Sequence, residues 1–338
     1  MWWRNRPRIA LIAVAIIVAI VGFFYYQWQS HRPKTTDEIN LRLEWTVQSQ
    51  FAGYIVADRL GYYAQEGLKV NIRPAGPDLK PLTTVAAGTD DVGIGVSNQV
   101  ALAQANGAPV KVIAQMFQDS ANRYVLLSKN RIGDLAELRG KKVGLWLGGD
   151  EAEFIAMLAT KGMKLSDVQV VPEGESVVPF LNGDYVLSEV TIYNELNQIE
   201  DALGGSQALQ IISPSSYNSA IVGDDIVVTE HTINTRRDIL VRFLRASMRG
   251  WQYAISNPEK TVDLVLAANP ELKHDDQLKQ LRAINQLILS GISRNEIGEM
   301  KLSDFETMLR ILRQSGQLNA PIDASTLFDQ TLWQDARK

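Results

Sequence analysis

Apolar and polar positions alternate along residues 41–229 in a pattern that predicts short strands separated by helices. Residues 41–47 alternate between apolar and polar side chains, which is typical of a strand. Residues 51–63 carry apolar side chains at Ala52, Ile55 and Val56, a helical spacing. The same criteria predict strands at 70–73, 92–96, 110–116, 124–127, 142–145, 168–171, 209–212 and 226–229, and helices at 79–87, 98–104, 150–161, 177–181 and 192–202. Such regular alternation indicates an α/β fold with a mainly parallel sheet.

Beyond residue 229 the pattern becomes almost wholly helical, with helices expected at 236–256, 258–268, 275–289 and 302–314. Two α/β halves followed by a helical C-terminal third predict a two-lobed protein. We expect the chain to cross between the lobes near Ser128 and Ser219. Lobe 1 then comprises residues 41–128 and 220–338, and lobe 2 comprises residues 129–219. A cleft between two such lobes is a natural place for a small ligand.

The first 40 residues have a different pattern. An uninterrupted apolar run spans residues 9–24, and aromatic residues extend it to Trp28, giving about twenty residues, enough to cross a bilayer. Aromatic residues flank the run on both sides, as at membrane interfaces. We expect a basic cytoplasmic end at 1–8, an uncleaved transmembrane helix at 9–28 and a linker at 29–40. The alternative is a cleaved signal peptide, which has the same basic and apolar regions. Both interpretations export the rest of the chain.

Charge and composition narrow the classes of function. Five of the 34 basic residues lie within residues 1–35, which contain no acidic residue, so the net charge of −4 divides into a basic end and a body of about −9. An acidic body argues against nucleic acid as a partner. The absence of cysteine excludes disulfides, thiolate metal sites, a thiol nucleophile and a lipid-modified N-terminal cysteine. With three histidines as well, the chain has little material for a zinc or histidine-based catalytic centre.

Motifs for common enzyme chemistry are missing from the sequence. It contains no phosphate-binding loop, no zinc-protease helix and no nucleophile turn. Gly93 and Gly95 lack the third glycine of a dinucleotide fingerprint, and the following Ser97 and Asn98 are predicted to cap a helix whose free N–H groups can hold a ligand oxygen. The acidic pairs Asp90-Asp91 and Asp224-Asp225 are expected to be turn residues, because adjacent strand residues face opposite ways. We expect no cofactor and no metal.

The informative segments lie at the start of the exported body. Residues 44–54 are EWTVQSQFAGY, residues 61–70 are GYYAQEGLKV and residues 76–78 are GPD. Further segments follow in order at 134–144, 179–183, 193–196 and 242–251. Together they resemble the periplasmic solute-binding proteins of ABC importers, in the thiamine-biosynthesis branch, over about residues 41 to 270. Members of that branch bind pyrimidine precursors of thiamine, and relatives bind riboflavin.

The resemblance implies a type II periplasmic-binding-protein fold of two lobes that close on a ligand by a hinge motion. It implies a solute-binding protein that delivers a flat nitrogen heterocycle to an ABC permease. With the apolar segment at 9–28, we expect a monomer that is anchored in the inner membrane, faces the periplasm and is not an enzyme. The resemblance also implies ligand contacts from Glu44, Trp45, Gln48, Gln50, Phe51, Tyr54, Asp78, Ser97, Asn98, Tyr193, Asn194 and Glu195.

Physical reasoning about these side chains leaves alternatives. Trp45 and Tyr193, from different lobes, can sandwich a flat ring, although Trp45 can equally be a core residue. Glu195 at a helix start can accept two hydrogen bonds from an aminopyrimidine, or it can be an exposed first-turn residue. Gln48 and Gln50 can both donate to and accept from a ring edge, or lie in a polar surface turn.

Departures from the family pattern limit the assignment. Phe51 stands where the pyrimidine branch has histidine, a residue that the pyrimidine-making relatives consume alongside a cysteine-rich motif. Because this chain has neither, the synthase hypothesis fails, and room is left for a larger, flavin-like ring. One remaining alternative is a sulfonate, nitrate or taurine carrier, for which Arg123 and Lys142 are the candidate anion ligands. The other is a ligand sensor or an enzyme on the same fold, and the absence of an output domain disfavours the sensor.

Overall fold

The computed structural model describes residues 36–76, 79–148 and 151–338. Residues 37–338 form one compact unit. The predicted membrane segment at 9–28 and the predicted ligand residue Asp78 lie outside the described residues. Among the helices that are described, none is both long and apolar enough to cross a membrane.

The first sheet has five strands in the order β2-β1-β3-β10-β4. Strand β1 pairs in parallel with β2 and β3, whereas β10 is antiparallel to β3 and β4. The strands are β1 (Asp37–Arg42), β2 (Leu68–Arg73), β3 (Val92–Gly95), β4 (Val110–Gln115) and β10 (Asp225–Thr229). The helices between them are α2 (Ala52–Arg59), α3 (Tyr62–Gln65), α4 (Pro81–Ala86) and α5 (Ser97–Ala105).

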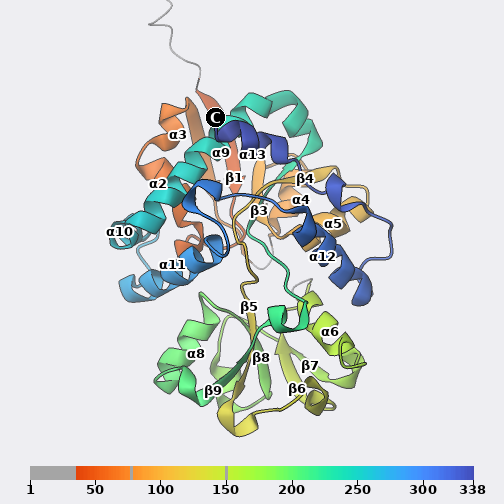
Figure 1. Ribbon diagram of the computed structural model, residues 1–338. Helices are drawn as coiled ribbons and strands as arrows, with labels where there is room; N and C mark the ends of the chain where they lie inside the picture. The colour runs from red at the N-terminus through yellow and green to blue at the C-terminus, as the bar shows by residue number, and fades with distance from the viewer. Residues whose placement is uncertain (1–35, 77–78, 149–150) are drawn as a thin grey trace, which may run out of the picture. The chain divides into compact units, whose positions relative to one another are not determined.

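The C-terminal third is helical, as predicted, and packs around this first sheet (Figure 1). Its helices are α9 (Glu230–Ser256), α10 (Pro258–Ala268), α11 (His274–Ile288), α12 (Leu302–Gln314) and α13 (Gln330–Ala336). The predicted start of the long helix at Arg236 coincides with a kink, because Arg236 has the non-helical angles φ −134° and ψ 29° within α9.

The second sheet has the order β7-β6-β8-β5-β9. Its strands are β5 (Asn122–Leu127), β6 (Lys142–Leu145), β7 (Gln169–Pro172), β8 (Leu187–Thr191) and β9 (Leu209–Ile212), and its helices are α6 (Ala152–Ala159), α7 (Val178–Asn182) and α8 (Glu195–Leu203). Here β5 is antiparallel to β8 and β9, while β6 is parallel to β7 and β8. Both sheets are therefore mixed, with one reversed strand each.

The reversed strands β5 and β10 are the ones that the chain enters from the other sheet. The chain leaves the first sheet after β4, crosses through residues 116–121 to β5, and returns through residues 213–224 to β10 (Figure 1). The first crossing therefore precedes the expected position near Ser128, since periodicity identifies a strand but not the sheet that it joins. Ser219 lies within the second crossing.

A buried carboxyl group contacts both crossings. Glu153 of α6 accepts a hydrogen bond from Ser120 Oγ at 3.1 Å and another from the Ile221 N–H. Burial raises the pKa of Glu153 to about 8. Helix α6 also packs against α12, and Lys279 of α11 forms an ion pair of 2.6 Å with Asp201 of α8. The two sheets are thus connected by side chains as well as by backbone.

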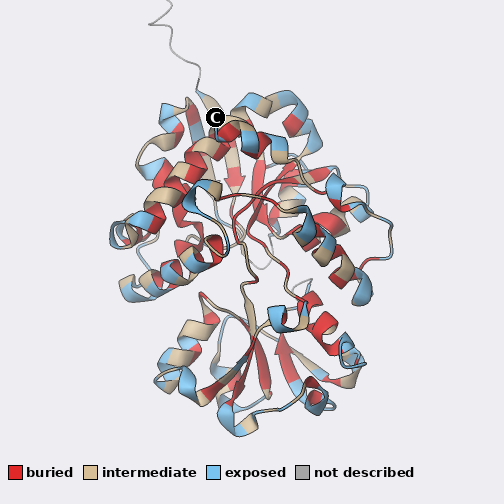
Figure 2. Cartoon of the chain, in the orientation of Figure 1, coloured by how far each residue is buried: buried red, intermediate tan, exposed pale blue. Residues whose placement is uncertain are grey.

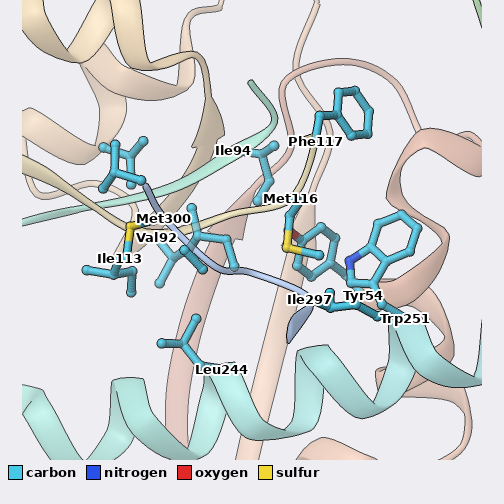
Figure 3. Packing of buried hydrophobic residues seen from close by; sticks show 14 of the residues in the cluster. Tyr54, Val92, Ile94, Ile113, Met116, Phe117, Leu244, Trp251, Ile297 and Met300 are labelled. Carbon is cyan, nitrogen blue, oxygen red and sulfur yellow. The ribbon is translucent and has the colours of Figure 1, made fainter. Parts of the chain in front are cut away.

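Buried side chains concentrate on the strands and on the inward faces of the helices (Figure 2). In the first sheet's core, α2 crosses α9 at close range. Tyr54 packs edge-on against Trp251, with ring centroids 5.8 Å apart (Figure 3). A Cβ atom added to Gly53 would lie 2.2 Å from the Trp251 ring, and one added to Gly250 would lie 2.0 Å from the Gly53 carbonyl oxygen. Two glycines therefore set the spacing of these helices.

We predict that Gly53→Ala and Gly250→Ala each lower the free energy of unfolding by about 1–3 kcal/mol or more, because the added methyl group forces α2 and α9 apart. Urea denaturation measures the change. Gly174→Ala is the matched control, since a Cβ there meets nothing within 4 Å, and we expect it to stay within about 0.5 kcal/mol of the parent. Equal stability of all three variants would contradict the inferred close packing.

Candidate functional site

A cavity of about 650 Å³ lies between the two sheets. Its wall is built where the parallel strands end: Trp45 follows β1, Phe117 follows β4, Trp146 follows β6 and Tyr193 follows β8. Side chains just before the reversed strands complete the wall, among them Asp224 before β10. In open α/β sheets, ligands bind outside the carboxyl ends of the strands, so the cavity occupies the expected place.

The cavity is lined by four aromatic side chains, which come from both sheets and from the first crossing: Trp45, Phe117, Trp146 and Tyr193. Phe117 and Tyr193 are in contact, with ring centroids 5.9 Å apart and planes inclined by 60°. Trp45 lines the cavity and also packs against the edge of the core. It is therefore both a cavity residue and a core residue, the two alternatives that the sequence left open. Aromatic faces on opposite walls are suited to binding a flat ring.

Glu195 is not an exposed first-turn residue, and its carboxylate already accepts hydrogen bonds within the protein. It is 7% exposed, and one carboxylate oxygen accepts hydrogen bonds from the Thr191 N–H at 2.9 Å and the Thr191 hydroxyl at 2.6 Å. The other oxygen accepts from Asn194 Nδ2 at 2.6 Å. These donors fix the carboxylate on the cavity wall, where the oxygen bonded to Asn194 has a second lone pair for a further bond.

A row of side-chain amides holds Asp224 in the wall. Gln280 Nε2 donates to Gln48 Oε1 at 3.0 Å, Gln48 Nε2 donates to Gln50 Oε1 at 2.9 Å, and Gln50 Nε2 donates to Asp224 Oδ1 at 3.0 Å. Gln48 and Gln50 therefore belong to a network rather than to a polar surface turn. Burial raises the pKa of Asp224 to about 7. Its neighbour Asp225 is fully buried, which raises its pKa well above the usual value.

Glu173 lies on the opposite wall, at the end of β7. It accepts a hydrogen bond of 2.5 Å from Ser188 Oγ, and burial raises its pKa to about 7. A Cβ on Gly144 would lie 2.4 Å from the Glu173 carboxylate, so glycine at this position leaves the space that the carboxylate occupies.

The structure places seven of the predicted ligand residues on the cavity wall: Glu44, Trp45, Gln48, Gln50, Tyr193, Asn194 and Glu195. Their role in binding stays a prediction. Phe51 and Tyr54 are turned into the core, with at most 1% of their surface exposed, because the helical path after Gln50 rotates them away from the cavity.

The predicted helix cap at Ser97-Asn98 is wrong, since Val96 is the N-cap of α5 and no side chain caps it. Ser97 Oγ instead donates to the Val222 carbonyl at 3.2 Å, and Asn98 Oδ1 accepts from the Gln99 N–H at 2.8 Å. Neither Ser97 nor Asn98 is among the residues that line the cavity.

Sequence reasoning missed Trp146, Glu173, Glu189 and Asp224. Glu189 lies in β8, a strand that the sequence did not predict, and accepts from the Trp146 N–H at 3.0 Å. Asp224 was interpreted as a turn residue; it has a left-handed backbone with φ 52° but is 6% exposed and faces the cavity. The available signal was position, since Trp146 directly follows the predicted strand at 142–145 and Glu173 lies two residues after the one at 168–171.

Neither candidate anion ligand lies on the cavity lining. Arg123 donates to the carbonyl oxygens of Ser120 and Asn122 and pairs with Asp119 at 3.6 Å. Lys142 is exposed at the start of β6. Within the described part of the lining, Lys80 is the only basic residue. Among the described residues, no group of three or more His, Asp or Glu side chains is arranged to hold a metal ion.

Comparison with known proteins gives one matching family, described as NMT1/THI5 like, over residues 48–261. The riboflavin-binding protein RibY of Chloroflexus aurantiacus is 26% identical over 310 residues, which cover 87% of this chain and 85% of the relative. A 4-amino-5-hydroxymethyl-2-methylpyrimidine phosphate synthase of Legionella pneumophila is 26% identical over 240 residues, which cover 70% of this chain and 75% of the relative.

Solved structures share the fold. The periplasmic aliphatic sulphonate binding protein SsuA of Escherichia coli superposes with a TM-score of 0.66 at 14% identity, covering 87% of this chain and 92% of that one. The chain therefore has the two-lobe α/β fold of periplasmic binding proteins.

We predict that Glu173→Gln becomes more stable relative to the parent as the pH rises. Folded Glu173 keeps its proton up to about pH 7, whereas the unfolded chain loses it near the ordinary value of 4.5, so the parent loses stability between these pH values. The variant escapes this loss, which we expect to reach roughly 1–3 kcal/mol. Urea denaturation at pH 5, 6, 7 and 8 measures the difference. The exposed neighbour Glu175, changed to Gln, should show no such trend, and parallel curves for Glu173→Gln and the parent would refute the burial argument.

Proposed function

Because the chain belongs to the NMT1/THI5-like family, we propose that it is the solute-binding protein of an ABC importer, which captures a flat nitrogen heterocycle and delivers it to a permease. The observation that carries this proposal is the cavity between the two sheets, where aromatic rings on opposing walls alternate with carboxyl and amide groups. The ligand class is a thiamine pyrimidine precursor or a related ring, including a flavin, in keeping with the relatives.

In this proposal Trp45 and Tyr193 stack on the two faces of the ligand ring. Trp45 comes from the first sheet and Tyr193 from the second, so the ring binds only when both walls approach it. Glu195 accepts hydrogen bonds from the ring edge and Asn194 donates to it. Gln48 and Gln50 offer amide groups from the first sheet's side of the cavity. Glu44 lines the same wall as Trp45. Asp78, from the predicted loop after β2, is a further candidate contact.

Each sheet with its helices forms one lobe, and we assign the hinge to the crossings at 116–121 and 213–224. Two connecting segments restrict the motion of two rigid bodies to opening and closing around the ligand. The apolar segment at 9–28 anchors the protein as a monomer to the membrane, with the cavity on the extracytoplasmic side, where a permease collects the ligand.

Binding rather than catalysis fits the chemistry of the cavity. A relative bears the name of a pyrimidine phosphate synthase, but this chain has phenylalanine at position 51 and no cysteine. Phe51 is also fully buried away from the cavity. The sulfonate-binding alternative has the fold in its favour, but the residues described on the cavity wall include no arginine.

We predict that the freshly purified full-length protein carries a heterocycle that native mass spectrometry identifies by its mass. Calorimetry with riboflavin, 4-amino-5-hydroxymethyl-2-methylpyrimidine and taurine then ranks the ligand classes. Trp45→Leu should weaken binding of the heterocycle by roughly 1–3 kcal/mol, because a stacking surface is lost. Tyr62→Leu is the matched control, since Tyr62 lies outside the cavity lining with its ring 4.3 Å from the Arg249 guanidinium. Saturable binding of taurine without binding of either ring would overturn the proposed function.

A further inference from the structure

Carboxyl groups dominate the polar part of the cavity wall. Six acidic residues line it, set against the single basic residue Lys80 of the described lining. The first sheet's side contributes Glu44 and Asp224, and the second sheet's side contributes Glu173, Glu175, Glu189 and Glu195. Lys80 is exposed to solvent, so it does little to neutralise the interior of the cavity.

The carboxyl groups on this wall receive hydrogen bonds from neutral donors. Glu173 accepts from the Ser188 hydroxyl, Glu195 from Thr191 and Asn194, and Asp224 from the Gln50 amide. Neutral dipoles orient a carboxylate but leave its charge in place. These bonds therefore fix the positions of the three carboxyl groups without supplying a counter-charge.

Elsewhere in this chain a buried carboxylate is neutralised by arginine. The side chain of Asp90 is 0% exposed and pairs with Arg42 at 2.8 Å and with Arg73 at 3.0 Å. Burial alone would raise the pKa of Asp90, but hydrogen bonds from Arg42, Thr84 and Arg73 outweigh it and lower the pKa. In the cavity, the pKa values of the half-buried Glu173 and the buried Asp224 are instead raised to about 7. The hydrogen bonds that Glu173 and Asp224 accept thus come from a hydroxyl and an amide, whereas Asp90 pairs with two arginines.

We propose that the cavity selects a heteroaromatic cation, whose positive charge supplies the counter-charge that neutral hydrogen-bond donors do not give to Glu173 and Asp224. A cationic ring also gains from the aromatic walls, because Trp45 and Tyr193 present π faces that attract cations. A phosphorylated ring is excluded, since its charge would face carboxylates. The inference rests on the proposed function, because it takes the cavity to be the binding site, and it specifies the charge of the ligand.

Binding of a cation at this wall releases protons. Glu173 faces Tyr185 and Glu195, while Asp224 faces Glu44, Tyr54 and Asp225, so each meets groups that are neutral or acidic. With pKa values of about 7, both are partly protonated in the empty protein at neutral pH. A cation favours the charged carboxylates and lowers these pKa values, so protons leave on binding and affinity rises from pH 6 to pH 8.

The test uses three probes that share one aminopyrimidine ring: thiamine as the cation, 4-amino-5-hydroxymethyl-2-methylpyrimidine as the neutral form, and its phosphate as the anion. Isothermal titration calorimetry of the full-length protein at pH 6, 7 and 8, in two buffers of different ionisation enthalpy, gives affinity and proton release. We expect thiamine to bind at least tenfold more tightly than the neutral ring at pH 7, with net proton release, and the phosphate to bind most weakly.

Two variants, one on each side of the cavity, test whether its carboxyl groups cause the preference for a cation. Glu173→Gln and Asp224→Asn should each reduce the preference for the cation and the proton release, and asparagine tolerates the left-handed backbone at position 224. Glu306→Gln, an exposed position on α12 outside the lining, is the matched control and should change neither.

Equal affinities for the three probes, or tighter binding of the neutral or phosphorylated ring, would overturn the charge proposal while leaving heterocycle binding intact. If no probe and no riboflavin bound, the proposed function itself would fail, which is a different outcome.

Discussion

The carboxyl group of Glu153 is the contact on which the geometry of the binding cavity depends. It bonds to Ser120 in one crossing and to the Ile221 N–H in the other, at the two places where the chain passes between its sheets. A buried carboxyl is costly unless it is hydrogen-bonded, so the bonds from Ser120 and Ile221 that compensate the burial of Glu153 also hold both crossings to α6. Together with the packing of α6 against α12 and the Lys279–Asp201 ion pair, this side chain holds one sheet against the other at the cavity.

Strand direction explains why the cavity collects so many functional groups. All of the parallel strands end toward the same space, and the two reversed strands begin there because the chain enters them from the other sheet. Residues that lie far apart in sequence, such as Glu44 and Asp224, therefore share one wall. Burial behind the wall then sets the chemistry, because desolvation rather than a charged partner raises the pKa values of Glu173 and Asp224.

The sequence predicted the alternation of strands and helices, the helical C-terminal third and the segments at 44–50 and 193–195 that reach the cavity. It predicted these because periodicity and short motifs are local properties. It could not assign residues 124–127 to a sheet, since pairing partners are set by tertiary contacts. Phe51 and Tyr54 follow Gln50 closely in sequence, yet helical rotation turns them into the core. Glu173 and Asp224 were missed because their burial depends on tertiary contacts, which the local sequence does not reveal.

The place of β10 between β3 and β4 has a consequence for the order in which the protein is assembled during synthesis. Every strand of the second sheet lies within residues 122–212, so that sheet is complete in the emerging chain before β10 exists. The first sheet begins earlier in the sequence but lacks an inner strand until residue 229 has been added. Until then the strand that pairs with both β3 and β4 is missing. The first sheet is therefore begun before the second sheet and completed after it.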